Sequence, residues 1–400
     1  MMTREAYIRQ AMANLRVMSR TANGELDTSA SADKKAMMAV SSGEAAKDLA
    51  LDNFQGALDL AWDNRYRVFS DAGDLRSFIE GLARAVNRGL LRDGVLYRCG
   101  ADSAKYPYTP VAQIGAAAAW FYEHLFSLLC RDPYDAVEAA ATAEYYINLT
   151  CHFFADGCGK CAMATAAWLL MRGNHSLPVY PGQEAYYGFC RSFSRAPAGS
   201  ADDRADFARF LPYYRSLFGE DAAGQEGTDA LTILLPGRII TDNAQNTVAQ
   251  IDAIRHLLRP EALSLDAAKL DYISSVGLRM LLILLGEYKT LTMFNVNETV
   301  YEILDISGFT SLMQVDRALK AISTDGCALI GKGQNGSVYR YAPDTVVKVY
   351  SDRNKLEDVR RENQMSRFCF VSGLPPPFPS TWFGLGSTSA RCTRCWTPGR

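Results

Sequence analysis

The chain has 400 residues, a net charge of −2 at pH 7 and 48% hydrophobic residues. This length exceeds what a single hydrophobic core usually covers, so we expect two or three globular domains. Basic residues are scattered along the chain, so we expect no nucleic-acid partner. The sequence has no long apolar run and the N-terminus has no apolar signal-peptide core, so we expect no membrane partner. We therefore expect a cytoplasmic protein whose ten cysteines are reduced thiols.

The first third of the chain has the periodicity of a helical bundle. Residues 1–50 show patchy helical spacing and predict an N-terminal helical segment. From Phe54 to Gly89 apolar residues recur at helical intervals. The stretch from Leu96 to Pro110 interrupts this pattern with extended, tyrosine-rich and proline-rich sequence, which by itself is also typical of a plain surface loop.

The central motif lies between Tyr145 and Met171, and its core reads Cys151-His152-Phe153-Phe154-Ala155-Asp156-Gly157-Cys158-Gly159-Lys160. Two glycines just before an apolar helix allow backbone N–H groups to face an anion, so the segment predicts a phosphate cradle. Lys160 adds a positive charge. Asp156 could hold a divalent metal against phosphate oxygens, and His152 could accept a proton from a hydroxyl. The alternative is a packed core histidine beside two phenylalanines.

The stretch HFFADGCGK resembles the signature of the Fic family, His-x-Phe-x-acid-Gly-Asn-Gly-Arg, whose members transfer part of a nucleotide to a protein hydroxyl. The resemblance implies an all-α domain over residues 51–219, with a small β-hairpin flap between Leu96 and Pro110 that docks the target by strand addition. It also implies site roles: His152 as general base, Phe154 as loop anchor, Asp156 as magnesium ligand, Gly157 and Gly159 as phosphate nest.

Some positions depart from the family pattern. Cys158 replaces an asparagine that contacts the α-phosphate, Lys160 replaces an arginine, and Met163 replaces a second arginine. Members often carry an inhibitory Ser/Thr-x-x-x-Glu-Gly/Asn motif. The nearest match here, Thr21 to Leu26, lacks the final residue and is interpreted as a turn.

A second domain follows a linker at residues 220–230. Strand-like runs alternate with helical runs over residues 231–322, which predicts a sheet covered by helices. The phrases LPGRIITDNA, LSLDAAKLDYISSVGLRMLL and VYEILDISGF resemble STAS domains, the α/β fold of anti-sigma factor antagonists. The resemblance implies a phosphorylation switch at Ser275, with Ser274 where many members have aspartate. Helix capping by these serines is the alternative.

Within residues 323–374 the chain contains the runs Ile330-Gly331-Lys332-Gly333-Gln334-Asn335-Gly336-Ser337-Val338-Tyr339 and Val346-Val347-Lys348-Val349-Tyr350. These runs resemble the glycine-rich loop and the strand lysine in the N-lobe of a protein kinase. The resemblance implies remnants of an ATP site at Gly331, Gly333, Gly336, Val338, Lys348 and Glu362. Because no His-Arg-Asp or Asp-Phe-Gly sequence follows, we expect no phosphoryl transfer by a kinase mechanism. Residues 375–400 lose any pattern and are expected to be an irregular tail, for which a reading-frame shift is one hypothesis.

The sequence thus predicts a multidomain chain: an all-α Fic-like bundle, an α/β STAS sandwich and a partial kinase-like α+β lobe. The favoured activity is transfer of AMP from ATP, with Mg²⁺, to a Tyr, Ser or Thr hydroxyl of a protein. In this interpretation His152 and Lys160 are catalytic, Gly157, Cys158, Gly159 and Lys160 bind the nucleotide, and Asp156 binds the metal. The alternatives are a non-catalytic signalling adaptor that binds an anti-sigma-like partner, and a Fic-type phosphotransferase.

Overall fold

The computed structural model describes most of the chain: residues 3–19, 37–39, 44–102, 108–219, 230–318, 320–333, 336–342, 345–350, 378–385 and 392–397. It divides into two compact units, residues 1–292 and 293–400, and the boundary falls inside a strand. Among the helices that the structure describes, none is both long and apolar enough to cross a membrane.

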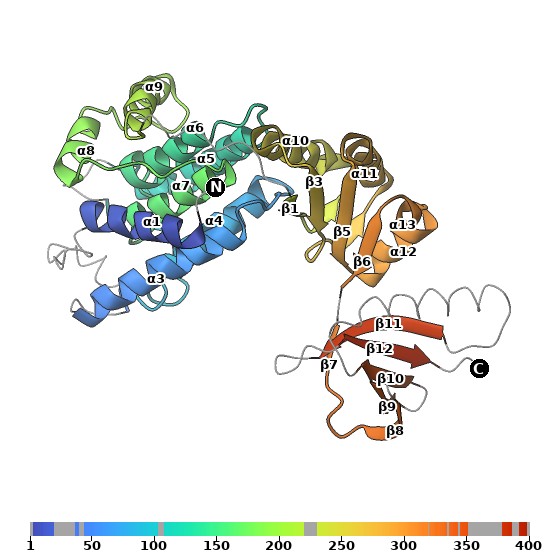
Figure 1. Cartoon of the computed structure of the whole chain (residues 1–400). Helices are drawn as coiled ribbons and strands as arrows, with labels where there is room; N and C mark the ends of the chain where they lie inside the picture. The colour runs from blue at the N-terminus through green and yellow to red at the C-terminus, as the bar shows by residue number, and fades with distance from the viewer. Residues whose placement is uncertain are drawn as a thin grey trace. The chain divides into compact units, whose positions relative to one another are not determined.

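The N-terminal part of the first unit is helical (Figure 1). Its helices are α1 (Arg4–Met18), α3 (Glu44–Asp63), α4 (Ala72–Val86), η1 (Val111–Gln113), α5 (Ile114–Leu129), α6 (Ala136–Ala143), the π-helix η2 (Glu144–Thr150), α7 (Cys158–Arg172), α8 (Gln183–Cys190) and α9 (Ala201–Arg215). Every residue of α7 except Gly159 is buried, so this helix forms the centre of the bundle. The predicted helical domain is therefore present.

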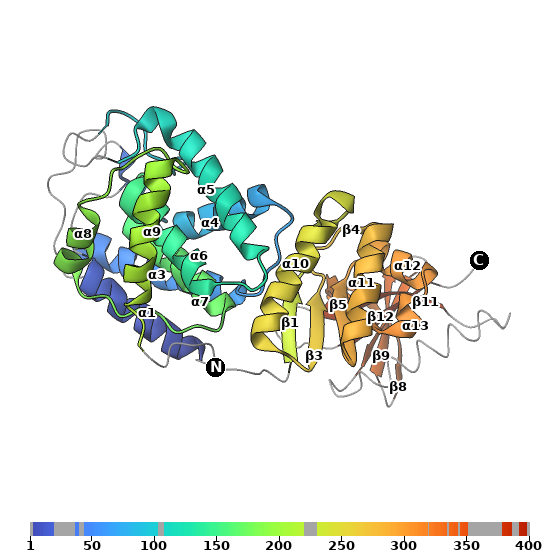
Figure 2. The same cartoon turned by 90° about the horizontal axis from the view of Figure 1, so that it is seen from above.

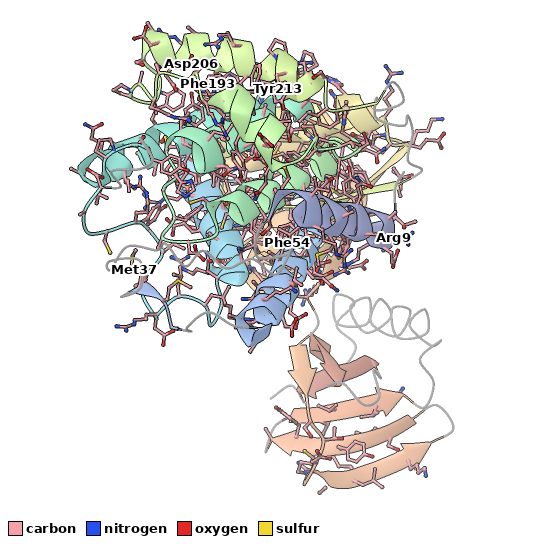
Figure 3. All side chains as sticks on the ribbon, turned by 90° about the vertical axis from the view of Figure 1, so that its left-hand side faces the viewer. Arg9, Met37, Phe54, Phe193, Asp206 and Tyr213 are labelled. Atoms are coloured by element: carbon pink, nitrogen blue, oxygen red, sulfur yellow. The ribbon has the colours of Figure 1, made fainter. Side chains whose placement is uncertain are left out.

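Local sequence explains why these helices begin and which face they bury. In α4 the Asp71 carboxylate caps the first turn by accepting from the Asp74 N–H at 2.8 Å. Its buried face has the i, i+3, i+4 spacing of Leu75, Phe78 and Ile79. Aromatic side chains also pack near α8 and α9, where Phe193 and Tyr213 are labelled in Figure 3.

The N-terminal helix belongs to the same core as the rest of the bundle. Tyr7, Ala11 and Leu15 of α1 are buried in the cluster that contains the motif helix. Helix α3 begins at Glu44 and continues through the expected domain boundary at residue 51. Residues 1–50 are therefore not a separate segment in the described ranges, because the buried face of α1 packs against α3 and α7.

The extended stretch after Leu96 pairs with the motif loop. The Arg98 N–H donates to the Phe153 carbonyl at 2.8 Å, and the Ala155 N–H donates to the Leu96 carbonyl at 2.9 Å. This edge of the expected flap is thus occupied by the chain's own loop. The second half of the expected hairpin includes residues 103–107, which lie outside the described residues.

The α/β part begins at β1 (Ala230–Leu234), and Figure 2 shows its helices beside the strands. Its further elements are β2 (Arg238–Ile239), α10 (Thr241–Leu258), β3 (Ala262–Asp266), β4 (Tyr272–Ile273), α11 (Ser275–Glu287), β5 (Thr290–Val296), α12 (Glu298–Ile306), α13 (Phe309–Leu312) and β6 (Gln314–Arg317). The sheet has the order β1-β3-β5-β6, and β1 pairs with β3 in parallel. A parallel pair with an intervening helix confirms the predicted α/β class.

A second sheet follows in the C-terminal part, with the order β7-β11-β12-β10-β9-β8. Its strands are β7 (Lys320–Ile322), β8 (Ala328–Gly333), β9 (Gly336–Ala342), β10 (Thr345–Tyr350), β11 (Phe378–Leu385) and β12 (Cys392–Thr397). The last two lie in the tail that we expected to be irregular. The prediction is wrong for these residues, because the runs Ser380-Thr381-Trp382-Phe383 and Cys392-Thr393 contain β-branched and aromatic residues, which favour strands.

Candidate functional site

The motif loop has a tightly specified backbone. It leaves the π-helix η2 at Thr150 and enters α7 at Cys158. His152 has φ of 49° and Gly157 has φ of 66°, both in the left-handed region. A Cβ on Gly157 would also lie 2.9 Å from Oδ1 of Asn87. Two independent features therefore require glycine at this position: the positive φ angle and the close approach of Asn87 at the end of α4.

This requirement gives a stability prediction. We expect Gly157→Ala to destabilise the protein by about 1 kcal/mol or more, because alanine is strained at positive φ and its Cβ meets Asn87. Gly81→Ala in α4 is the matched control, since a Cβ there meets nothing within 4 Å and alanine favours a helix. Urea unfolding should show a lower free energy of unfolding for Gly157→Ala than for the parent, and no decrease for Gly81→Ala. Equal stability of Gly157→Ala and the parent would contradict the strain.

His152 is held in one tautomer. Its Nδ1 lies 2.9 Å from the carbonyl oxygen of Asn148, and a carbonyl can only accept, so Nδ1 carries the proton. The other ring nitrogen, Nε2, is therefore a proton acceptor. The ring stacks on Tyr108, with centroids 4.1 Å apart and planes at 4°. This arrangement suits a general base.

Arg98 fixes the backbone on which the histidine is mounted. Its Nε donates to the His152 carbonyl at 2.5 Å, and its Nη2 donates to the carbonyls of Cys151 at 3.0 Å and Thr109 at 2.6 Å. Asn87 supports the other end of the loop through a 3.1 Å bond to the Asp156 carbonyl. Neither residue was singled out from the sequence, because both are distant from the motif along the chain and carry no local signal.

Two motif side chains are turned into the protein. Phe154, expected to anchor the loop, is fully buried and packs against Tyr97 with ring centroids 5.5 Å apart. Cys158 is also buried, and its thiol donates to the Phe154 carbonyl at 3.3 Å. A side chain in that position stabilises the turn. Asp156 is half-buried.

A cavity of about 180 Å³ lies beside the first turn of α7. The structure brings together three predicted site residues in its wall, Gly157, Gly159 and Lys160. Lys160 is only 9% exposed, so its charge is directed to a restricted volume. His152, Asp156 and Cys158 are not among the lining residues, which are Leu15, Met18, Ser19, Glu144, Asn148, Gly157, Gly159, Lys160, Met163, Tyr180, Gln183 and Tyr187.

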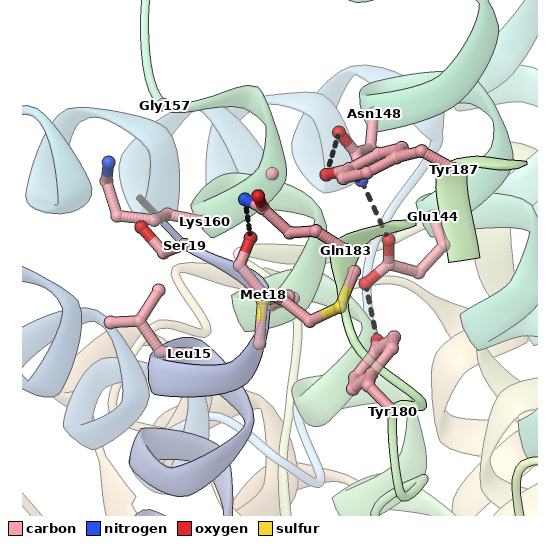
Figure 4. A pocket seen from close by; sticks show the side chains of 12 residues that line it. Leu15, Met18, Ser19, Glu144, Asn148, Gly157, Lys160, Tyr180, Gln183 and Tyr187 are labelled. Carbon is pink, nitrogen blue, oxygen red and sulfur yellow. Dashed lines mark hydrogen bonds between the residues drawn. The ribbon is translucent and has the colours of Figure 1, made fainter. Parts of the chain in front are cut away.

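The far wall of the cavity contains a buried carboxylate, Glu144, which is 1% exposed (Figure 4). Tyr180 donates to it at 2.8 Å, and Asn148 and Tyr186 donate to it at 3.4 Å each. Burial raises the pKa of Glu144 to about 7, and these donors partly oppose the shift. In the sequence Glu144 is a single acidic residue in an apolar run, so no pattern identified it.

Helix α1 supplies two of the apolar side chains of the wall. Leu15 and Met18 line the cavity, and Gln183 of α8 donates to the Met18 carbonyl at 2.8 Å. Asn14 is bonded to the Pro178 carbonyl at 2.9 Å. The segment Thr21 to Leu26, compared above with an inhibitory motif, lies outside the described residues.

The serines of the α/β part lie at the start of α11. The Ser274 hydroxyl caps the helix by accepting from the Gly277 N–H at 3.4 Å, while Ser275 is the first helical residue and is exposed. Gly277 is also required here, because a Cβ would lie 2.6 Å from Ile273 and 2.9 Å from Ile239. Ser274 therefore has a structural role, and Ser275 is the accessible hydroxyl.

The glycines of the kinase-like stretch lie on an antiparallel hairpin. Gly331 and Gly333 are on β8, Gly336 and Val338 are on β9, and Lys348 on β10 is the register partner of Val338. Glu362, the expected partner of Lys348, lies outside the described residues. The kinase-like interpretation of this stretch stays a prediction.

The described residues hold no group of three His, Cys, Asp or Glu side chains able to hold a metal ion. Asp156 supplies a carboxylate at this loop, and magnesium in proteins commonly takes one carboxylate together with phosphate oxygens.

Comparison with known proteins gives a match in the α/β part. No curated protein matches the chain. Among solved structures it is similar to a Fic domain containing signaling protein from Bacteroides thetaiotaomicron, with 16% identity and a TM-score of 0.37 over 62% of this chain and 90% of that one. The Fic resemblance therefore depends on the motif residues and their geometry. Residues 221–322 match the family model of the STAS domain, which confirms the resemblance predicted from the three sequence phrases.

Proposed function

We propose that the helical part transfers AMP from ATP to a Tyr, Ser or Thr hydroxyl of a protein. One observation supports this most directly: His152 has its Nδ1 committed to the Asn148 carbonyl, and the loop that carries it leads into the N-terminus of α7 with Lys160 in its first turn. A proton acceptor and a phosphate cradle are thus joined by five residues of one loop.

The proposed step needs positioning and charge. The acceptor hydroxyl oxygen attacks the α-phosphorus while Nε2 of His152 takes its proton, a new P–O bond forms, and the bond to the β-phosphate oxygen breaks to release pyrophosphate. Negative charge develops on the phosphoryl oxygens during this step. The first N–H groups of α7 and the Lys160 ammonium stabilise that charge. Arg98 holds the His152 carbonyl, so the base stays in place during the step.

Magnesium fits this site on the chemistry of its donors. Asp156 would hold it, and when bound the ion would neutralise phosphate charge. The protein's own contribution is to present the carboxylate on a fixed backbone, since the Asp156 carbonyl is bonded to Asn87.

The test uses ATP labelled at the α- or the γ-phosphate, the full chain, and a mixture of cellular proteins as acceptor. Label from the α-position that is lost in His152→Ala supports AMP transfer. Label from the γ-position would instead establish a phosphotransferase. Absence of both labels, with the parent folded, would contradict the enzyme proposal.

The STAS-like part supports a docking or regulatory role within the same proposal. Ser275 is exposed at the first turn of α11, and the neighbouring side chains Tyr272 and Val276 are 41% and 37% exposed. Phosphorylation there would add charge beside apolar surface and weaken a partner's contact. A signalling protein related to anti-sigma factors is the partner class that we propose. If no label is transferred, docking would be the chain's main function.

A further inference from the structure

The cavity beside α7 has two chemically different ends. At one end are Gly157, Gly159 and Lys160, the proposed phosphate cradle. At the other end is the Glu144 carboxylate, with neutral polar side chains around it and with Leu15, Met18 and Met163 as apolar walls. Among the described residues that line the cavity, Lys160 is the one cation and Glu144 the one anion.

The carboxylate is held as a fixed acceptor. Tyr180 donates to Oε1, while Asn148 and Tyr186 donate to Oε2, and Asn148 is itself bonded to the Tyr187 hydroxyl at 3.2 Å. These contacts come from three elements, η2, α8 and the segment that precedes α8, so the carboxylate cannot easily turn away from a ligand (Figure 4). A ligand group that reaches this end meets oxygen acceptors.

A chain of phosphates is a poor match for this end. Phosphate oxygens are acceptors with negative charge, so a terminal phosphate beyond Lys160 would face Glu144 and the methionine side chains of Met18 and Met163 without a second cation from the described lining. A nucleoside is a better match. It is uncharged, its hydroxyl and amine groups donate hydrogen bonds, and its base has apolar faces that suit leucine and methionine.

We propose that the nucleoside end of the donor nucleotide occupies this cavity with a hydrogen-bond donor directed at Glu144, and that its polyphosphate extends from the cradle away from Glu144, toward Asp156. This inference rests on the proposed function, and it adds the orientation of the donor and a specificity-determining residue. Glu144 selects nucleosides that bear an amine or a hydroxyl at the position it contacts.

The orientation is tested by the sign of a binding change. The full chain and Glu144→Gln are titrated by calorimetry with ATP, and separately with inorganic tripolyphosphate, in the presence of magnesium. The titrations are done at about pH 8, above the Glu144 pKa of about 7, so that the carboxylate is ionised. With the nucleoside in the cavity, Glu144→Gln weakens ATP binding on the order of 10-fold, because a charged acceptor is lost, and leaves tripolyphosphate unchanged. With the terminal phosphates in the cavity, the same variant binds both ligands more tightly, which would overturn the proposal. Glu184→Gln is the control, since Glu184 lies on the exposed side of α8.

A second variant keeps the proposal testable if Glu144→Gln fails to fold. Met163→Arg places a cation in the cavity, so it should weaken ATP binding if a nucleoside lies there and strengthen it if phosphates do. Two analogues identify the donor group that Glu144 contacts: ITP, which lacks the base amine, and 2′-deoxy-ATP, which lacks the 2′-hydroxyl. The analogue without the contacted group should bind the parent and Glu144→Gln equally, whereas the other analogue should bind the variant more weakly. Unchanged ATP binding in both variants contradicts the orientation while AMP transfer stands. Absence of ATP binding by the parent contradicts both proposals.

Discussion

Gln250→Leu should lower the free energy of unfolding of the protein by about 2–6 kcal/mol. Gln250 lies on α10 and is fully buried. Its Oε1 accepts from the Phe69 N–H at 3.0 Å, and its Nε2 donates to the Phe69 carbonyl at 2.9 Å. Leucine has a similar volume but leaves both backbone groups buried without a partner, and each such group costs about 1–3 kcal/mol.

The effect is expected to involve the whole of residues 1–292, because the contact joins the bundle to the α/β part. The Val68 N–H donates to the Leu234 carbonyl at 2.9 Å at the edge of β1, and Ala253 of α10 belongs to the bundle's hydrophobic core. Gln245→Leu is the matched control, since Gln245 is exposed on the same helix and should change stability by no more than about 0.5 kcal/mol. Urea unfolding followed by tryptophan fluorescence measures both. Similar midpoints for the two variants would show that the Gln250 contact does not carry this energy.

The features that could be predicted from sequence are those with local patterns. Strand-helix alternation and three phrases in order identified the α/β part. Helices with regular apolar spacing, such as α4, were also predictable. In each case the information lies within about ten residues of the element that it specifies.

The features that could not be predicted depend on contacts between distant residues. Glu144 becomes a cavity residue only because Tyr180 and Tyr186 pack over it, 36 and 42 residues later. Gln250 bonds to Phe69 across 181 residues. The predicted boundary at residue 51 lies where helical periodicity becomes clear in the sequence, yet α3 starts earlier, at Glu44, and packs against α1 and the motif helix. Whether a polar side chain is buried depends on such tertiary contacts, and it cannot be predicted from composition.

Arg98→Met should lower the rate of AMP transfer on the order of 10²-fold while ATP binding changes little. The guanidinium donates to the carbonyls of His152, Cys151 and Thr109, and it holds His152 at a φ of 49° that costs about 1–3 kcal/mol to maintain. Without these bonds the backbone at His152 can relax to an ordinary conformation. A displacement of about 1 Å of a catalytic group is enough for a loss of this size.

Arg98 is a positioning residue in this interpretation, so the measurements must separate position from folding and from binding. The single-turnover rate with α-labelled ATP should fall, the dissociation constant of ATP should stay within about twofold because Arg98 does not line the cavity, and the NMR signal of the His152 Nδ1 proton should broaden or vanish. Arg92→Met is the control, because exposed Arg92 donates to the Met38 carbonyl outside the motif loop. A rate loss that only follows the unfolded fraction, or an unchanged imidazole signal, would show that the loop holds its histidine without Arg98.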